Sequence, residues 1–235
     1  MATYENLVLI TSIINTPNTP LSYWHTRSIY SPQQRFQQLK QTIESVKHQI
    51  QPKPHILLVE CSTFTEEQRN YLSENVDTII NVCDPPETPQ KEEAIRNITS
   101  DSKALGEGTM TMTAFNYLIQ NNITWNHFYK ISGRYWLNNH FRKGADSNLF
   151  PNKSIIRYIQ DDPTCGCTSL YRLTYTHSII WNEYLKNSRE QMIQYRSYEN
   201  IFADFLATLP PDEFVVVPKI GVSGTWAPDG KAVNK

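Results

Sequence analysis

Short apolar runs alternate with amphipathic patterns through the first half of the chain. Residues 6–14, NLVLITSII, form an unbroken β-branched run of the kind found in a strand that is covered on both faces. Comparable runs at residues 55–61, 78–82 and 128–132 end where small or polar residues begin. The pattern predicts a buried strand at each of these places.

Helical patterns separate these runs. Ser31 followed by Pro32 and Gln34 is a capping box, and it opens a helix that ends before the prolines at 52 and 54. One apolar stripe runs along this helix: Phe36, Leu39, Ile43, Val46 and Ile50. A second capping box at Thr65 predicts a short helix to about residue 73, and residues 109–120 carry another buried helical face. Alternating strands and helices predict a parallel sheet with right-handed crossovers.

The alternation of strands and helices changes in two places. Residues 84–101 are polar, with three prolines and many charges, and we expect a surface loop there. After Pro151 the elements become shorter, and QDDPTCGC has the composition of a turn. The expected order is strand 154–159, strand 168–176, helix 178–188, helix 198–206 and strand 214–218. The glycine-rich, aromatic tail that follows is typical of a loop that covers a site.

Together these elements predict an α/β fold, in which helices flank a mostly parallel sheet and a smaller antiparallel section follows. A chain of 235 residues is suited to one domain of generous size or to two small ones, and we expect one. We expect a ligand-binding half at residues 1–141 and a second half at residues 142–235 that includes a closing C-terminal loop. The chain could also be one domain of a larger polypeptide.

Charge and cysteine content restrict the partners. The net charge is −1, from 22 Lys and Arg against 23 Asp and Glu, so bulk attraction to nucleic acid or an anionic membrane is not expected. No apolar run has the length of a membrane span. The first apolar run lacks the basic flank and cleavage site of a signal peptide. The four cysteines have neither a disulfide framework nor zinc spacing, which favours a reducing, cytoplasmic setting.

The strand end at Ser132-Gly133-Arg134 is the strongest candidate for chemistry. Ligands of open α/β sheets bind outside the carboxyl ends of the strands. A glycine there allows close backbone approach, and the planar fork of Arg134 matches a diphosphate or a carboxylate. The alternative is an ordinary arginine paired with a surface carboxylate, and this tripeptide alone does not separate the two.

Several ordered strings resemble one family. LVLITSIINTPNTPLSY, RSIYSPQQRFQQLKQTIESV, SKALGEGTMT, YKISGRYWL and PKIGVSG look like the small glycosyltransferase domain that large DNA viruses of chlorella-like algae encode. The resemblance covers nearly the whole chain. It implies a GT-A fold and transfer of a hexose or deoxyhexose from a nucleoside diphosphate, UDP in the first place, to a sugar or glycan acceptor. A viral protein of this kind would act in the host cytoplasm, in capsid glycan synthesis.

The resemblance also implies roles for residues of the donor site. Thr11 and Ser12, at the first strand end, should meet the nucleoside, and Glu60 should lie near the base or ribose. The alternative role for Glu60 is a carboxylate at a strand end that is exposed to water. Lys103 stands before a glycine-containing helix start, so this cation and backbone N–H groups near Gly106 would face the diphosphate. Those glycines could equally mark a turn.

One departure from the family concerns the metal. Glycosyltransferases of this fold usually hold Mn²⁺ or Mg²⁺ through an Asp-x-Asp at the fourth strand end, where this chain has Ser132, Gly133 and Arg134. Arg134 would then neutralise the leaving diphosphate itself. Asp161 and Asp162 are the remaining candidates for metal ligands, although adjacent aspartates before a proline are commonly turn residues. Metal dependence stays open.

Glu199 is the candidate for the acceptor side. It follows a helix start, where a carboxylate within reach of an acceptor hydroxyl acts as a base or stabilises positive charge, and where the helix lowers its pKa. The alternative role for Glu199 is a first-turn glutamate that complements the helix dipole, and His177 is a second possible base.

Two other functions remain: a catalytically silent module that binds nucleotide sugars or glycans, and a sugar nucleotidyltransferase. The second would need a glycine-rich basic loop after the first strand, and Asn15-Thr-Pro-Asn-Thr-Pro is not one.

Overall fold

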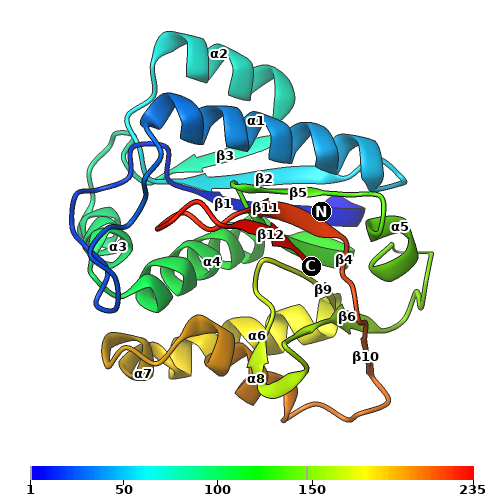
Figure 1. Ribbon diagram of the computed structural model, residues 1–235. Helices are drawn as coiled ribbons and strands as arrows, with labels where there is room; N and C mark the ends of the chain where they lie inside the picture. Colours follow the sequence, from blue (N-terminus) through cyan, green and yellow to red (C-terminus); the bar gives the residue numbers. More distant parts are fainter. Residues whose placement is uncertain (1, 147) are drawn as a thin grey trace.

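In the computed structural model, which describes residues 2–146 and 148–235, helices cover both faces of a central sheet (Figure 1). Within the described residues the sheet has seven strands in the order β10-β6-β9-β4-β1-β2-β3. Their bounds are β1 Ala2–Ser12, β2 His55–Glu60, β3 Thr78–Asn81, β4 Ile123–Ser132, β6 Ser154–Ile156, β9 Leu170–Thr174 and β10 Phe214–Val216. The fold class predicted from the sequence is confirmed.

The first four strands are parallel neighbours. β1 pairs with β2 on one side and β4 on the other, and β2 pairs with β3. Thr11 lies opposite Ser132, so the carboxyl ends of β1 and β4 meet at one edge of the sheet. β9 joins β4 in the antiparallel direction and brings the second half of the chain into the same sheet.

The alternation of β1 divides the hydrophobic core between two faces. Val8 and Ile10 pack with α1 (Pro32–Gln49) and α2 (Glu66–Asn75) on one face. Both predicted capping boxes are present, at Ser31 and at Thr65, and they fix where these helices begin.

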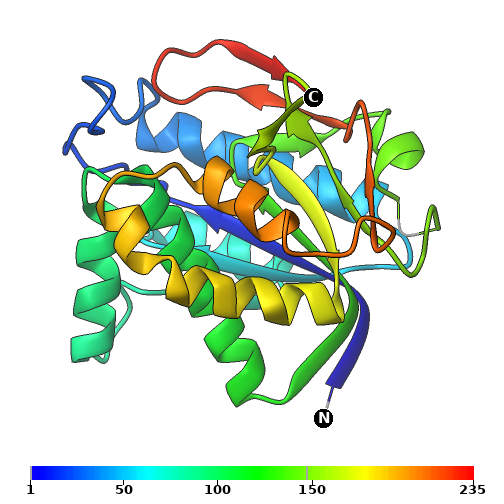
Figure 2. The same cartoon turned by 90° about the horizontal axis from the view of Figure 1, so that it is seen from below.

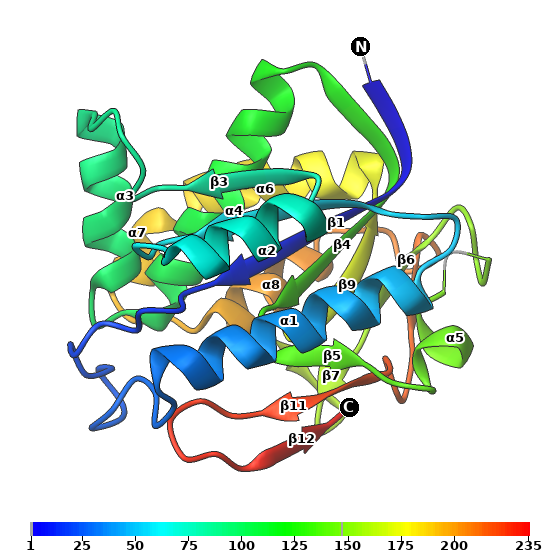
Figure 3. The same ribbon diagram turned by 90° about the horizontal axis from the view of Figure 1, so that it is seen from above.

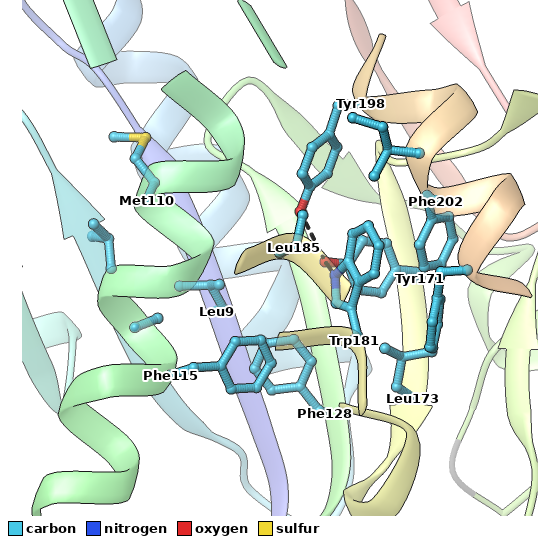
Figure 4. Close-up of a cluster of buried hydrophobic side chains, with 14 of the residues drawn as sticks. Leu9, Met110, Phe115, Phe128, Tyr171, Leu173, Trp181, Leu185, Tyr198 and Phe202 are labelled. Carbon is cyan, nitrogen blue, oxygen red and sulfur yellow. Dashed lines mark hydrogen bonds between the residues drawn. The ribbon is translucent and has the colours of Figure 1, made fainter. Parts of the chain in front are cut away.

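On the opposite face, Leu9 and its neighbours pack with α4 (Lys103–Gln120), α6 (Tyr175–Asn187) and α8 (Tyr198–Leu206), which Figure 2 shows from below. Tyr171, Trp181 and Tyr198 meet in this layer (Figure 4). The indole Nε1 of Trp181 donates to the hydroxyl of Tyr171 at 3.0 Å, and that hydroxyl lies 3.5 Å from the hydroxyl of Tyr198. The hydrogen bonds satisfy polar groups that burial would otherwise penalise.

Two small antiparallel sheets lie beside the main one. β5 (Tyr135–Leu137) pairs with β11 (Val222–Thr225), which pairs with β12 (Ala232–Asn234). In Figure 3 the turn between β11 and β12 lies beside the loop that precedes α1. The second is the hairpin of β7 (Tyr158–Ile159) and β8 (Asp162–Gly166), which packs against α8. Within the described residues, no helix combines the length and apolar character of a membrane span.

The expected loop at residues 84–101 is wrong, because α3 (Pro89–Thr99) occupies most of it. Thr88 caps this helix and Pro89 begins it, which is a recognisable start signal. Ala94, Ile95 and Ile98 form a short apolar stripe that packs against the core, and Ile98 is buried. The three prolines and many charges of residues 84–101 concealed this stripe.

The start predicted for the next helix is also wrong. α4 begins at Lys103, not Thr109, and the hydroxyl of Ser102 accepts from the N–H of Leu105 to cap it. Gly106 therefore lies inside the helix. A Cβ at this position would stand 3.1 Å from the carbonyl oxygen of Ile98, so the glycine permits close packing of α4 on α3.

In the second half, one predicted turn and one predicted strand differ from the structure. The QDDPTCGC segment contains β8 in place of a simple turn. The predicted strand 168–176 ends at Thr174, whose side chain caps α6 by accepting from the N–H of His177 at 3.3 Å. His177 thus lies in the first turn of a helix. Threonine favours both strands and N-caps, so its β-propensity concealed the boundary.

Candidate active site

A cleft lies at the carboxyl edge of the parallel strands. It is lined by the ends of β1 and β4, by the first turns of α4, by the segment 13–28 and by the turn 226–228. Six of the residues that the sequence analysis selected line it together: Thr11, Ser12, Lys103, Gly106, Ser132 and Arg134. Residues far apart in the sequence therefore contribute to one site.

Arg134 enters the cleft from the end of β4. Its guanidinium carbon lies 4.8 Å from the ring centre of Tyr135, so the side chain stacks on an aromatic face. Its Nε is buried and has no hydrogen-bond partner in the described part of the chain. No carboxylate of the described residues forms a salt bridge with it. The guanidinium group is held in place and retains N–H groups that can donate to a ligand.

Arg35, on the first turn of α1, is a second arginine of the cleft, and sequence reasoning missed it. It is 5% exposed, yet within the described residues it too has no carboxylate in a salt bridge. Its Nη1 donates to the amide oxygen of Gln38 at 2.8 Å, and its Nε donates to the carbonyl of Ile13 at 3.4 Å. Burial, and then the neighbouring charge of Arg134, lower the pKa of Arg35 to about 10. The group is still charged at neutral pH, so the cleft holds two cations that an anion would stabilise.

Lys103 and Glu199 form an ion pair at the boundary of the cleft. Lys103 Nζ lies 3.0 Å from Glu199 Oε1, and the hydroxyl of Thr168 donates to the same oxygen at 3.2 Å. Burial, the largest single influence, would raise the pKa of Glu199, but the charge of Lys103, its hydrogen bond to the carboxylate, a backbone hydrogen bond and the charge of Lys235 together outweigh burial and lower the pKa to about 2. The same pair, with Glu107, raises the pKa of Lys103 against the effect of burial. The direction expected for Glu199 is confirmed, although the main cause is Lys103 and not the helix.

A second ion pair lies deeper below the cleft. Lys130, on β4, is fully buried and pairs with Glu107 of α4. Its ammonium also donates to the hydroxyl of Ser132 and the carbonyl of Thr168. This ion pair engages the carboxylate of Glu107, which lies between the two glycines of α4 in the sequence. The pair fixes α4 on the sheet.

The polar residues at the ends of β1 and β2 have different positions. The hydroxyl of Ser12 is buried at the cleft wall, next to the carboxylate of Glu60. Glu60 does not line the cleft. Its Oε1 accepts from the backbone N–H groups of Ile14 and Cys61 at 3.0 and 2.9 Å, and from the hydroxyl of Ser62 at 2.8 Å. Glu60 therefore supports the chain as it leaves β1.

Gly133 shapes the cleft by close packing. Its N–H donates to the carbonyl of Thr11 at 2.8 Å, which links the ends of β4 and β1. A Cβ at this position would stand 2.9 Å from the Cβ of Ser12 and 3.0 Å from a methyl of Leu39. Only glycine allows the strand end to approach α1 this closely without displacing Ser12.

Two segments cover the cleft. The segment 13–31 and the turn 226–230 are joined by a hydrogen bond from the N–H of Ile29 to the carbonyl of Ala227, at 3.0 Å. The rings of Trp24 and Trp226 pack edge to face with centres 5.1 Å apart. Trp226 and Ala227 line the cleft, as the composition of the tail suggested.

The residues of this site do not fit a divalent cation at the strand end. Arg134, Arg35 and Lys103 occupy that region with positive charge, and no group of three metal-ligating side chains is found within the described residues. Asp161 and Asp162 lie in the β7–β8 turn. Gln160 and Asp161 both have positive φ, 53° and 59°, as in a type I′ hairpin. Asp162 accepts hydrogen bonds from Thr164, so both aspartates have turn functions.

His177 lies outside the cleft. Its Nδ1 is 2.7 Å from the hydroxyl of Ser154, and its Nε2 is 2.8 Å from a carboxylate oxygen of Glu213. These contacts join α6 to β6 and to the segment before β10. The histidine is a buried structural group in this position.

No protein-family model matches the sequence, and no curated protein matches it significantly. Solved structures do match. Core-mannan synthase A from Aspergillus fumigatus, in a form with Mn and GDP, has 9% identity over 97% of this chain and 80% of that chain, with a TM-score of 0.52. Mouse xyloside xylosyltransferase 1 has 10% identity over 92% and 85%, with a TM-score of 0.48.

A glycosyltransferase involved in glycosylation of the major capsid of PBCV-1 has 11% identity over 90% of this chain and 81% of that chain, with a TM-score of 0.42. At such low identities the comparisons concern the fold alone. The likeness to core-mannan synthase A shows the fold of the chain, which is the GT-A fold.

Proposed function

We propose that this protein is a glycosyltransferase that moves a hexose or deoxyhexose from a nucleoside-diphosphate sugar, UDP-linked in the first place, to a sugar acceptor. The observation that carries the proposal is the pair Arg35 and Arg134. Both guanidinium groups face the cleft at the carboxyl edge of the sheet, and neither has a carboxylate partner in the described part of the chain. Arg35 is buried and Arg134 is half-buried, and cations removed from water without a salt-bridge partner are costly unless a ligand supplies the anion.

In this proposal the donor lies along the ends of β1 and β4. Thr11 and Ser12 contact the nucleoside, and the hydroxyl of Ser12 at the cleft wall gives it a hydrogen-bonding group. The diphosphate lies between Arg35, Arg134 and Lys103. Planar forks bind two phosphate oxygens at once, and they strengthen their hold as negative charge develops on the leaving group.

The transfer step needs an acceptor hydroxyl on the side of Glu199. The hydroxyl oxygen attacks the anomeric carbon, the bond from that carbon to the phosphate oxygen breaks, and the nucleoside diphosphate leaves with the bonding electrons. The hydroxyl proton passes to Glu199 or to water. With its pKa lowered to about 2, Glu199 is ionised throughout the neutral range, so it can also stabilise positive charge on the sugar.

Arg134 and Arg35 take the role that a divalent cation has in many enzymes of this fold, and the mechanism proposed here routes no step through a metal. The resemblance of the ordered sequence strings supports a finer proposal, synthesis of a virus-type capsid glycan. That part of the proposal rests on sequence strings alone.

The test uses donor hydrolysis, which needs no identified acceptor. The protein is incubated with UDP-glucose, UDP-galactose, UDP-rhamnose and GDP-fucose, and release of the nucleoside diphosphate and the thermal shift are both measured. Arg134→Ala should reduce turnover by about 10²- to 10³-fold, because charge on the leaving group loses its main stabilising donor. Its unfolding free energy should change little, since the guanidinium forms no salt bridge in the described residues.

Arg35→Met is the companion variant. Removing an unpaired buried cation should leave the unfolding free energy unchanged or higher, while the dissociation constant for UDP rises by about tenfold or more. Arg69→Ala, which removes a surface arginine paired with Asp84, is the matched control. A thermal shift without turnover for any donor would instead indicate a silent binding module. Turnover by Arg134→Ala close to wild type would refute the leaving-group assignment.

A further inference from the structure

A second hollow adjoins the donor cleft. Tyr23 and Lys103 line both, so the two spaces meet at these side chains. The second hollow is also lined by Tyr195, Tyr198 and Glu199. The carboxylate on the acceptor side in the proposed function therefore opens onto a separate space, away from the arginine pair.

Tyr195 has an unusual backbone conformation. It follows α7 (Arg189–Ile193), and its φ is +63°. The N–H of Arg196 donates to the carbonyl of Gln191 at 2.9 Å, which is the hydrogen bond of a Schellman motif. Glycine is the usual residue at this left-handed position, because a Cβ is strained there. A tyrosine at this position suggests that its side chain has a use.

The ring of Tyr195 is not used for core packing. The side chain is 55% exposed, and its hydroxyl donates to a carboxylate oxygen of Asp101 at 2.9 Å. The carbonyl of Asp101 accepts from the N–H of Ser22 at 3.1 Å, so the same residue anchors the segment that carries Tyr23. Tyr23 is 51% exposed as well. Two open tyrosine rings are thus held at the same hollow through Asp101.

We infer that Tyr23 and Tyr195 are the aromatic walls of an acceptor subsite that takes a pyranose ring. Aromatic faces bury the apolar C–H surface of a sugar, and polar groups at the base of the hollow orient its hydroxyls. Glu199 accepts from the hydroxyl that attacks, and Lys103 separates this subsite from the donor diphosphate. The inference rests on the proposed function, because it names the side chains that hold the sugar acceptor of the same site.

Tyr195→Gly is the test variant. Glycine prefers this backbone conformation, so the variant should fold with a melting temperature equal to or above that of the wild type. Methyl glycosides of glucose, galactose, mannose and xylose serve as acceptors, with the best donor from the hydrolysis panel. The KM for the acceptor should rise by about tenfold or more, while donor hydrolysis without acceptor stays within about twofold of wild type. Tyr195→Phe, which loses the bond to Asp101 and keeps the ring, should show a smaller rise.

Phe150→Gly is the matched control. Phe150 is also an exposed aromatic at positive φ, 54°, but it lines neither hollow. The Phe150→Gly variant should leave both the KM for the acceptor and the rate of donor hydrolysis unchanged. An unchanged acceptor KM in Tyr195→Gly would overturn the subsite, as would an equal rise in Phe150→Gly.

Failure of the proposed function gives a different result. If wild-type protein neither hydrolyses any donor nor transfers, saturation-transfer NMR with the same methyl glycosides and UDP reports binding directly. Contacts from the glycoside that disappear in Tyr195→Gly and persist in Phe150→Gly would support the subsite in a silent protein. No glycoside contact in the wild type would overturn it.

Discussion

At the scale of single residues, the site combines a lysine that is paired with a carboxylate and two arginines that are not. Lys103 has a partner in Glu199, with 25% and 20% of their side chains exposed. Arg35 and Arg134 have no such partner in the described residues, and their charges disfavour each other. A diphosphate therefore gains most from the arginines, while Lys103 also controls the ionisation of Glu199. This division predicts distinct effects of substitution.

The first prediction concerns pH and Lys103. The pKa of Glu199 is about 2 in the folded state, below its ordinary value of 4.5. A lowered folded pKa stabilises the protein above pH 4.5, and this contribution is lost as the pH falls towards 2. In Lys103→Met, burial, which is already the largest single influence on Glu199, loses its main opposing charge, and we expect the pKa of Glu199 to rise above its ordinary value. The pH dependence then reverses, because the ionised carboxylate is disfavoured as the pH rises through the raised pKa.

Urea unfolding between pH 3.5 and 7 measures this effect. The deficit in unfolding free energy of Lys103→Met relative to wild type should grow with pH, to on the order of 2 kcal/mol at pH 7. The double variant Lys103→Met, Glu199→Gln is the control, and in it the added pH dependence should disappear. A deficit that is constant across this range would show that Lys103 does not set the pKa of Glu199. Glu199→Gln alone should spare UDP affinity and reduce transfer.

At the scale of elements, the sequence predicted what depends on local pattern and missed what depends on contact. The apolar run of β1 and the capping box of Ser31 were sufficient to place β1 and α1 within a few residues. α3 was missed because its apolar stripe is short and lies among prolines and charged residues. Arg35 was hidden for a related reason: it stands next to Phe36 in a helix whose sequence shows only one apolar face. That it faces the cleft depends on the crossing of α1 over β4, which no local pattern contains.

At this scale we predict that Arg27 holds the segments that cover the cleft. Its guanidinium donates to the carbonyls of Ile98, Thr99 and Ser100 at the end of α3, and thereby anchors the segment 13–31. Arg27→Met should release this segment, and with it the turn 226–230, since the two are joined through Ile29 and Ala227. Hydrogen exchange of peptides from both segments should increase together, and the KM for the donor should rise by about tenfold.

Arg96→Met removes an exposed arginine of the same helix and is the control for Arg27→Met. It should change neither exchange nor KM. Faster exchange in the 13–31 segment alone would show that the two covering segments are independent. Unchanged exchange in both would mean that contacts other than Arg27 hold the cover.

At the scale of the whole molecule, charge is distributed unevenly. The net charge is −1, which by itself indicates no preference for anions. The sheet topology nevertheless collects Arg27, Arg35, Lys103 and Arg134 at one edge, from three separate parts of the chain. Composition could not reveal this, because the acidic residues that balance these cations lie elsewhere or are paired. The local field is therefore a property of the fold.

The last prediction follows from that field. Because arginines occupy the strand end, donor hydrolysis and UDP binding should continue in excess EDTA and should not increase when Mn²⁺ is added. The dissociation constant for UDP should instead rise several-fold as NaCl is raised from about 50 to about 500 mM, since salt screens partly exposed charges. Uridine, which lacks phosphates, is the control ligand, and its binding should be nearly independent of salt. Loss of hydrolysis in EDTA with recovery on Mn²⁺ would show that a metal and not the arginine pair neutralises the diphosphate. In that case Arg134→Ala would also be expected to retain metal-dependent turnover, so the two experiments together decide which positive charge the leaving group meets.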